Sequence, residues 1–421
     1  YEGRIDQSNI TTNNGDHGDH CAGTIMSAGN LDPLAQGMAP GAFLYVFGSN
    51  NNNYNAVPAM YQNDELVITS KSYSNGCNAG YTTLSRDLDE QIDDYSSLIH
   101  VFSAGNSGTS DCGYGAGSGW GNVTGGHKVG KNVICVGNLT SIDALANSSS
   151  RGPAEDGRIK PDLVAPGVNI CSGQAEESLT PFGTSCGSDT HANGASMYME
   201  MSGTSQATAV AGGASALVRE YLREDQGISG PTSALIKAVL INGAQDLGTP
   251  DIPNSNEGWG KIDLKQSLNP SHAGIDLDMA VDNNRVIQPG FSSVYAYDID
   301  VSKGLDITLV WTDAAGSSGT PQSESRLISN LDLELIDPNG VVYHGNQFAN
   351  GFSIAGGTSD SLNNVERIKL PSDTSSVSGT WQVKIIHRGG VSVTYGLAMS
   401  GSFSQSFVPD LMTLSNSIFL N

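Results

Sequence analysis

A Gly-Thr turn followed by a run of small residues constrains this chain more than any other stretch. The sequence Met-Ser-Gly-Thr-Ser-Gln-Ala-Thr occupies residues 201–208, and residues 209–218 are mostly small. This pattern predicts a tight turn that places Ser205 at the N-terminus of a helix. A hydroxyl there lies beside unsatisfied backbone N–H groups, where the oxyanion of an acyl transfer can be stabilised. An N-capping serine before a close-packed helix would give the same pattern.

The composition argues against a protein that binds nucleic acid. The 421 residues suffice for two domains, and 20 lysines and arginines stand against 43 acids, for a net charge of −23. Such a surface would repel the phosphates of nucleic acid. The acids are either a solvated surface or a source of calcium ligands. The sequence contains no apolar run that predicts a membrane span and no recognisable signal peptide.

Two patterns of hydrophobicity divide the chain. Up to residue 270, short apolar strands alternate with helical segments, which predicts an α/β domain with a parallel, doubly wound sheet at residues 1–270. The expected strands are residues 44–47, 66–70, 98–102 and 133–137, and the expected helices are about 87–96, 205–223 and 231–243. Beyond Pro270, apolar residues alternate with period two, which predicts an all-β sandwich at 271–405 and a tail at 406–421.

Three sequence blocks, in this order, resemble motifs of the subtilases, the subtilisin-like serine proteases. Residues 16–24 resemble the histidine motif, residues 103–108 the oxyanion-asparagine motif, and residues 201–208 the nucleophile motif. Each motif is weak alone, but the ordered set is specific. Further blocks at 309–313, 330–333 and 363–366 resemble the C-terminal jelly-roll domain of some alkaline subtilases. The resemblance therefore extends over essentially the whole chain.

The resemblance implies a serine endopeptidase that acts on a protein or peptide substrate. Ser205 would attack the peptide carbonyl, His17 would move the proton, and Asn106 would hold the oxyanion together with the Ser205 backbone N–H. A structural or adhesive extracellular module, with the fold but without activity, is the second hypothesis. An esterase would need a Gly-x-Ser-x-Gly elbow, which the Ser205 segment lacks.

The resemblance also implies where a peptide substrate binds. By position, Ser72, Tyr73 and Ser74 form one backbone edge and a wall of the P1 pocket, which receives the side chain that precedes the scissile bond. Ala104 and Gly105 are the expected second element of the substrate site. The family usually has glycine in place of Ser74, so this serine is expected to narrow the pocket or alter substrate pairing.

The sequence departs from the family most at its beginning. The family's orienting aspartate precedes the histidine motif by tens of residues, but here Asp6 lacks the expected Asp-Thr-Gly block and Asp16 adjoins His17. The aspartate is therefore expected upstream, for example on an associated fragment, or it is missing, which would lower the rate by about 10⁴. Asp19 replaces a threonine and is expected to raise the pKa of His17. Zinc binding by His17 and His20 is an alternative without an evident third ligand.

The cysteines and sequons favour a secreted, disulfide-bonded glycoprotein. The six cysteines allow several pairings: Cys171 and Cys186 bracket a polar loop and could close it, and Cys77 and Cys112, in loops beside the expected site, could pair. Cys21 and Cys135 are predicted to be buried thiols. The Asn-X-Ser/Thr sequons are at Asn9, Asn122, Asn138 and Asn147.

The β domain contains candidate ligands for a structural calcium ion. They are oxygen-bearing side chains in its best-matching blocks, namely Asp313, Asn330, Asp332, Asn364 and Glu366. The same residues could instead satisfy backbone groups at turns and strand ends, and the sequence leaves both interpretations open.

Overall fold

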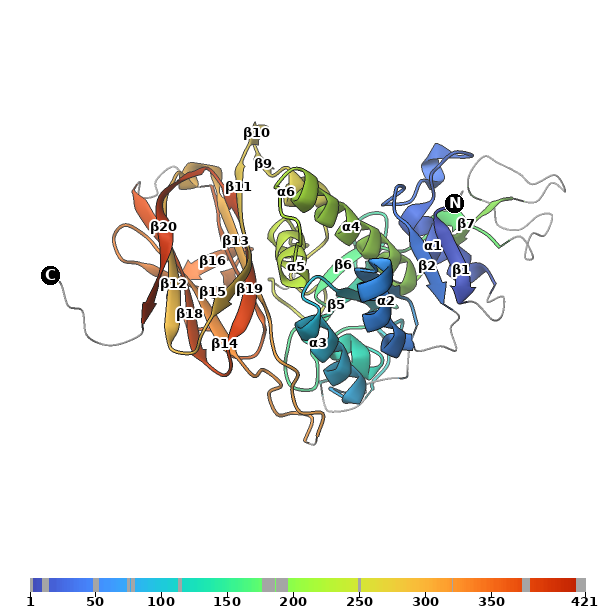
Figure 1. Cartoon of the computed structure of the whole chain (residues 1–421), viewed down its shortest axis with the longest axis horizontal. Coiled ribbons are helices and arrows are strands. Elements are labelled where there is room, and N and C mark those ends of the chain that lie inside the picture. Colours follow the sequence, from blue (N-terminus) through green and yellow to red (C-terminus); the bar gives the residue numbers. More distant parts are fainter. Residues whose placement is uncertain are drawn as a thin grey trace.

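The computed structural model describes residues 3–9, 15–47, 53–73, 76, 80–112, 116–175, 186, 196–248, 251–319, 321–372 and 379–413. An α/β half and a β-sandwich half lie side by side along the longest axis of the molecule (Figure 1). The architecture changes after the short helix α6 (Leu264–Leu268), at a small hairpin made of β9 (Ser271–His272) and β10 (Ile275–Asp276).

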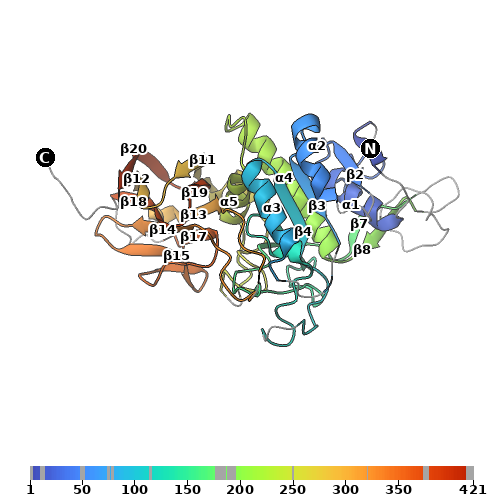
Figure 2. The ribbon, with the colours of Figure 1, turned by 60° about the horizontal axis from the view of Figure 1, so that its bottom comes forward.

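A four-stranded parallel sheet is the centre of the α/β half. Its order is β3-β4-β5-β6, and the strands are β3 (Ile68–Lys71), β4 (Ile99–Ser103), β5 (Ile134–Leu139) and β6 (Leu163–Pro166). All residues of β4 and β5 are buried, as expected for a parallel sheet covered on both faces. The helices α4 (Thr204–Glu224) and α5 (Ser233–Asn242) pack on one face, and α3 (Thr83–Asp94) packs on the other (Figure 2).

Small residues allow α4 to pass close to its neighbours. Gly213 of α4 lies against the Met38 side chain and the Ile25 backbone, where an added Cβ atom would be 2.5 Å from Met38 Cβ and 3.4 Å from the Ile25 carbonyl oxygen. The helix α1 (Asp16–Met26), which begins with the histidine motif, also packs against α4. The run of small residues after Ser205 therefore sets how closely the two helices that carry the candidate site residues approach each other.

Two smaller sheets flank this core. The strands β1 (Ile5–Asn9) and β2 (Leu44–Phe47) form a parallel pair, beside the turn η1 (Pro33–Ala35), the turn η2 (Asn53–Ala56) and helix α2 (Val57–Asp64). The strands β7 (Ile170–Gly173) and β8 (Tyr198–Met201) form an antiparallel pair. In the described part of the chain, β2 pairs only with β1 and β3 only with β4.

Two antiparallel sheets enclose one apolar core in the β half. The first has the order β11-β19-β13-β17 and consists of β11 (Asp278–Ile287), β19 (Val393–Gly401), β13 (Leu305–Thr312) and β17 (Val365–Leu370). The second has the order β16-β15-β14-β18-β12-β20 and consists of β16 (Phe352–Ala355), β15 (Val342–Ala349), β14 (Asn330–Ile336), β18 (Thr380–Gly389), β12 (Phe291–Ile299) and β20 (Phe403–Thr413). A 3-10 turn, η5 (Val301–Lys303), links β12 to β13. The period-two alternation predicted beyond Pro270 is confirmed in β13, where Leu305, Ile307, Leu309 and Trp311 all belong to this core.

The two halves share buried contacts at the interface between them, which we call the seam. Val310, Val365 and Ala398 of the sandwich pack into the same cluster as the apolar side chains of α5. The ammonium of Lys131 and the carboxylate of Asp313 form an ion pair across the seam, with both side chains fully buried. The seam is therefore continuous with the protein core.

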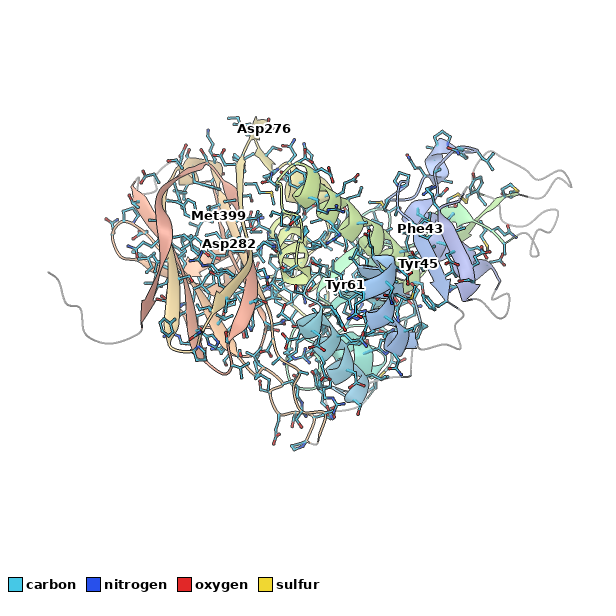
Figure 3. The ribbon with its side chains drawn as sticks, in the orientation of Figure 1. Phe43, Tyr45, Tyr61, Asp276, Asp282 and Met399 are labelled. Carbon is cyan, nitrogen blue, oxygen red and sulfur yellow. A yellow bond between two sulfur atoms is a disulfide. The ribbon has the colours of Figure 1, made fainter. Side chains whose placement is uncertain are left out.

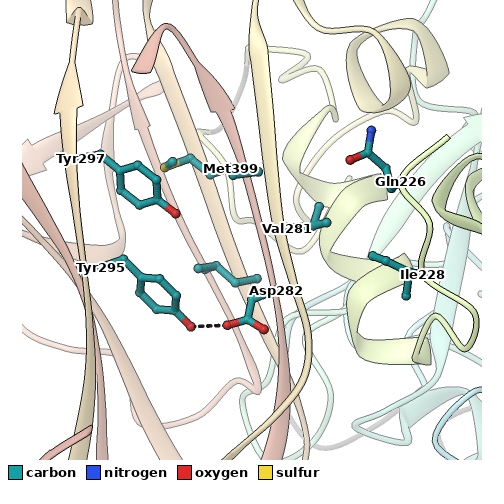
Figure 4. A pocket seen from close by; sticks show the side chains of 9 residues that line it. Gln226, Ile228, Val281, Asp282, Tyr295, Tyr297 and Met399 are labelled. Carbon is teal, nitrogen blue, oxygen red and sulfur yellow. Dashed lines mark hydrogen bonds between the residues drawn. The ribbon is translucent and has the colours of Figure 1, made fainter. Parts of the chain in front are cut away.

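A cavity of about 360 Å³ opens beside this seam, between the end of α4 and the strands β11, β12 and β19 (Figure 4). The Tyr295 hydroxyl donates to Asp282 at 2.6 Å and also lies 2.6 Å from the Tyr395 hydroxyl. The polar groups of Tyr295, Asp282 and Tyr395 are therefore hydrogen-bonded to one another at the wall of this cavity.

The cysteine predictions can be compared with the structure. The disulfide between Cys171 and Cys186 is confirmed. Cys112 is disulfide-bonded, and its predicted partner Cys77 lies outside the described residues. Cys135 is a buried free thiol, as predicted, whereas Cys21 is free and half-buried.

Burial excludes two of the predicted glycosylation sites in the folded protein. The side chains of Asn122 and Asn138 are fully buried, because both lie in the packed loops and strands behind the site. Asn147 is exposed, and the Asn9 side chain lies outside the described part. Among the helices that the structure describes, none has the length and apolar character needed to cross a bilayer.

Candidate active site

Hydrogen bonds join the nucleophile turn to the oxyanion loop. Ser205 lies in the first turn of α4, and the neighbouring Thr204 donates its backbone N–H to Asn106 Oδ1 at 2.9 Å and its hydroxyl to the same oxygen at 3.1 Å. The backbone N–H of Gly105 donates to Thr204 Oγ1 at 3.2 Å. The Asn106 side chain is at the surface, and with its oxygen engaged, its NH₂ group is the atom that can donate to an incoming oxyanion.

Ser205 and Ser72 are held together by two reciprocal hydrogen bonds. Ser205 Oγ donates to the Ser72 carbonyl oxygen at 3.3 Å, and Ser72 Oγ donates to the Ser205 carbonyl oxygen at 3.0 Å. The second bond fixes the end of β3 against the first turn of α4. The first predicted substrate edge therefore begins next to the nucleophile.

His17 approaches the same place from α1. Its Nε2 atom is 3.9 Å from Cys21 Sγ, and the Cys21 thiol in turn interacts with the Ser72 side chain. A continuous series of contacts thus connects the imidazole, Cys21, Ser72 and Ser205. Desolvation by the surrounding protein lowers the pKa of His17 below its usual value, which is opposite to the direction expected from Asp19.

Asp6 and Asp16, two acids that precede His17 in the sequence, accept hydrogen bonds from other groups. Asp16 accepts a hydrogen bond from the Ala175 backbone N–H at 3.1 Å, and Asp6 accepts one from the Ser8 backbone N–H at 2.7 Å. Among the described residues, no carboxylate is paired with His17. The orienting group that the family resemblance requires is therefore absent from the described part of the chain.

His20 has a structural environment. Its ring is fully buried, and Nε2 donates to the carbonyl oxygens of Ile170 at 2.9 Å and Met199 at 3.2 Å. These bonds attach α1 to β7 and β8. The described residues contain no group of three His, Cys, Asp or Glu side chains arranged to hold a metal ion, so the zinc alternative has no support.

The two predicted substrate elements, residues 72–74 and residues 104–105, differ in the contacts that they make. The ring of Tyr73 packs against His127 with 5.4 Å between centroids, and its hydroxyl is bonded to that of Tyr54. Ser74 lies outside the described residues. Ala104 and Gly105 are buried, and their carbonyl oxygens accept the backbone N–H groups of Thr124 and Ser150, both at 2.9 Å. Ala104 and Gly105 can therefore form a wall, but their carbonyls are not available as a strand edge.

The predicted calcium ligands occupy separate environments. Asp313 accepts hydrogen bonds from Lys131 and two backbone N–H groups, whereas Asp332 pairs with Arg388 at 2.5 Å. Asn364 donates to Asn132 and to the Trp311 carbonyl, Asn330 donates to Asp332 at 3.3 Å, and Glu366 accepts from the Leu333 N–H at 2.6 Å. A single calcium site built from all five residues does not fit this arrangement, because most of their oxygens satisfy protein groups.

The 3-10 turn η3 (Gly126–Val129) was not identified from the sequence. It brings His127 against Tyr73 and Lys128 against Ser103, so it lies between the two predicted substrate elements. The sequence feature that could have indicated this turn is the basic pair His127 and Lys128 among glycines, shortly before the buried strand β5.

Comparison with known proteins identifies the family. Residues 2–260, more than half of the chain, match the profile of the subtilase family, peptidase family S8. A similar curated protein is the serine protease/ABC transporter B family protein tagA of Dictyostelium discoideum, which is 36% identical over 258 residues, or 56% of this chain and 14% of that protein. The serine protease AprX of Bacillus subtilis (strain 168) is 33% identical over 147 residues, or 33% of this chain and 30% of that protein.

A solved structure, that of the prenylagaramide maturation protease PagA, covers 63% of this chain and 84% of its own chain, with a TM-score of 0.45 and 17% identity. The chain spans about one seventh of the length of the tagA protein. The match of its first 260 residues nevertheless extends over all three motif blocks. The chain belongs to the subtilase family of serine proteases.

Proposed function

We propose that this chain is the catalytic region of a serine endopeptidase, with a C-terminal sandwich of the jelly-roll type. The observation that carries the proposal is the series of contacts from Asn106 through Thr204 and Ser205 to Ser72 and His17. An oxyanion donor, a nucleophile and a base from three distant parts of the sequence reach one surface. Such an arrangement is what acyl transfer requires.

In this proposal Ser205 Oγ attacks the carbonyl carbon of the scissile bond and its proton moves to His17 Nε2. The oxyanion accepts hydrogen bonds from the Asn106 amide and the Ser205 backbone N–H. His17 then protonates the leaving amine, and a water molecule hydrolyses the acyl-enzyme by the same route. Nε2 suits this role because it is the ring nitrogen on the side of Cys21, toward Ser72.

We propose that the orienting carboxylate comes from a segment outside residues 1–421, either upstream in the same protein or on an associated fragment. The support is that β2 and β3 each have one pairing partner in the described structure and belong to parallel sheets, so both can accept a further parallel strand. A groove of about 330 Å³ follows β1, β2 and α2 and is lined by Asp6, Tyr45, Phe47 and Met60. The ring of Phe43, directly before β2, packs against that of Tyr45 on β2, and both are on this side of the molecule (Figure 3).

Labelling with a fluorophosphonate tests the proposal. The protein is expressed from its complete reading frame, reacted with the probe and digested, and the modified peptide is identified by mass spectrometry. We expect the label on Ser205, and none on a Ser205→Ala variant that has the same circular dichroism spectrum. Absence of label on folded wild-type protein would refute the assignment of Ser205 as nucleophile.

The alternative, a catalytically inactive module with a structural role, is favoured by two observations. Ser205 Oγ is directed to the Ser72 carbonyl oxygen, and no carboxylate is paired with His17 in the described residues. The same labelling experiment separates the two hypotheses. For either function we propose an extracellular location, supported by the disulfide between Cys171 and Cys186.

A further inference from the structure

A cluster of basic side chains lies beneath the predicted substrate site. We call Lys71, His127 and Lys128 the basic cluster. Lys71 Nζ is 3.4 Å from the centroid of the Tyr54 ring, and the rings of Tyr54 and Tyr73 are both within 6.1 Å of His127. Lys128 follows His127 in η3 and is fully buried.

Lys128 differs from every other buried lysine of the described chain. Lys131 pairs with Asp313, and Lys160 and Lys237 both pair with Asp162 at 2.6 and 2.7 Å. Within the described residues Lys128 has no such carboxylate, and its ammonium donates to two neutral hydroxyls, Ser103 Oγ at 3.3 Å and Thr124 Oγ1 at 3.1 Å. Because a buried charge is normally paired, this ammonium has an unmet electrostatic requirement.

The ammonium lies behind Ala104 and Gly105, the predicted second element of the substrate site, because Thr124, which accepts from Lys128, donates its backbone N–H to the Ala104 carbonyl oxygen. Thr124 Oγ1, which accepts from Lys128, lies 2.2 Å from the position that a Cβ atom on Gly105 would occupy. Gly105 is in turn bonded through its N–H to Thr204, the neighbour of Ser205. A substrate side chain that passes between Tyr73 and Gly105 therefore approaches Thr124 first and the Lys128 ammonium behind it.

We propose that Lys128 makes this enzyme selective for an acidic P1 residue, with the aspartate or glutamate carboxylate of the substrate completing the ion pair that the protein leaves open. This inference rests on the proposed endopeptidase function. The hydroxyls of Thr124 and Ser103 would turn toward the carboxylate as it enters, and Lys71 would add positive potential from the Tyr54 side. A substrate carboxylate would pair with the Lys128 ammonium in the way that Asp162 pairs with Lys160 and Asp313 pairs with Lys131.

Protonation of the cluster provides a second readout. Burial lowers the pKa of Lys128 to about 8 and that of Lys71 to about 7. The titratable groups that face them include no carboxylate among the described residues; they are His127 on η3, His100 on β4, Cys135 on β5, and Tyr54 with its bonded partner Tyr73. The ammonium is charged below its pKa, so the preference for an acidic P1 residue should weaken as the pH rises above about 8.

A matched peptide series tests the proposal. The peptides differ only at P1, which is Glu, Gln or Leu, and kcat/KM is measured at pH 7 with protein from the complete reading frame. We expect Glu to exceed Gln by about tenfold or more, since a fully desolvated charge pair is worth at least that factor. Lys128→Met should bring the Glu/Gln ratio to about 1. Lys265→Met, which removes an exposed lysine of α6, should leave the ratio unchanged.

The outcomes separate this inference from the proposed function. Fluorophosphonate labelling of Ser205 together with a Glu/Gln ratio of 1 or less would overturn the inference alone. Absence of both labelling and cleavage would overturn the proposed function and the inference with it. If Lys128→Met does not fold, the wild-type ratio between pH 6 and 10 decides, because a ratio that stays constant over this range contradicts a role for the buried ammonium.

Discussion

The buried ion pair at the seam gives a prediction that can be worked out from individual contacts. The Lys131 ammonium has three acceptors, which are Asp313 and the carbonyl oxygens of Ala314 and Arg326. The Asp313 carboxylate also accepts the backbone N–H groups of Ile328 at 2.9 Å and Ser329 at 2.7 Å. Asp313→Asn keeps the shape but points an NH₂ group at a donor and leaves the ammonium without its counter-charge. Breaking a pair of this kind costs about 3–5 kcal/mol of unfolding free energy.

A double-mutant cycle measures how much of that cost is coupling. We expect Asp313→Asn and Lys131→Met each to lower the free energy of unfolding by about 3–5 kcal/mol, and the double variant to lose about 2–3 kcal/mol less than the sum. Urea unfolding at pH 7, followed by fluorescence and far-ultraviolet circular dichroism, provides the values. The exposed pair of Lys261 and Asp143 is the matched control, and breaking it should cost less than about 1 kcal/mol.

Two results would refute this reasoning. Single variants that lose less than about 1 kcal/mol would show that the pair is not needed at the seam. Strict additivity would show that the two residues act independently, although their charged atoms are in contact. The cycle also reports on the joint between the halves, because Lys131 lies in the α/β half and Asp313 at the end of β13.

Three further predictions concern single titratable groups. The pKa of His17 is lowered by desolvation, so the imidazole in residues 1–421 alone, without the proposed carboxylate, should titrate with a midpoint below about 6.5 by nuclear magnetic resonance; a midpoint above that value would contradict it. Burial raises the pKa of Glu366 well above its unfolded value, so the wild type loses stability as the pH rises past about 4.5. Glu366→Gln should therefore raise the urea midpoint of unfolding at pH 8 but not at pH 4. A lower midpoint for the variant at pH 8 would contradict this. Burial raises the pKa of the Cys21 thiol to about 11, so iodoacetamide at pH 8 should alkylate the native protein about a hundredfold more slowly than a model thiol. The mass of the Cys21 peptide measures the extent of alkylation. Urea-unfolded protein should react at the rate of the model thiol.

Secondary structure could be predicted well where the hydrophobic period is unbroken. The expected helix at 205–223 is observed as α4 (Thr204–Glu224), and the expected strand at 44–47 is β2. The strands β12 and β17 were not predicted, although parts of both are buried. In β12 the inward positions include Ser293 and two tyrosines, so the apolar alternation that identifies a strand is weak there.

The candidate site could be predicted only as far as short motifs extend. His17, Asn106 and Ser205 are each marked by their neighbours in the sequence, and the fold brings those three blocks into one series of contacts. No sequence motif identifies Lys128, because its proposed role depends on which groups surround its ammonium in the fold. Ser103 is 25 residues away in the sequence, and no local pattern shows that a carboxylate is absent.

The acidic residues of the β domain show why partners that are distant in sequence decide the role of a charged group. Asp313 and Glu366 were candidate calcium ligands because carboxylates in a matched block suit a hard cation. In the structure a lysine 182 residues away supplies the charge that Asp313 needs, whereas no cationic side chain among the described residues pairs with Glu366, which lies inside the sandwich with a raised pKa. A carboxylate is thus paired with a lysine at the seam, whereas in the core burial raises the pKa of Glu366. The difference lies in whether the fold brings a counter-charge to the carboxylate, and by that criterion Lys128 is the buried lysine whose counter-charge remains for a substrate to supply.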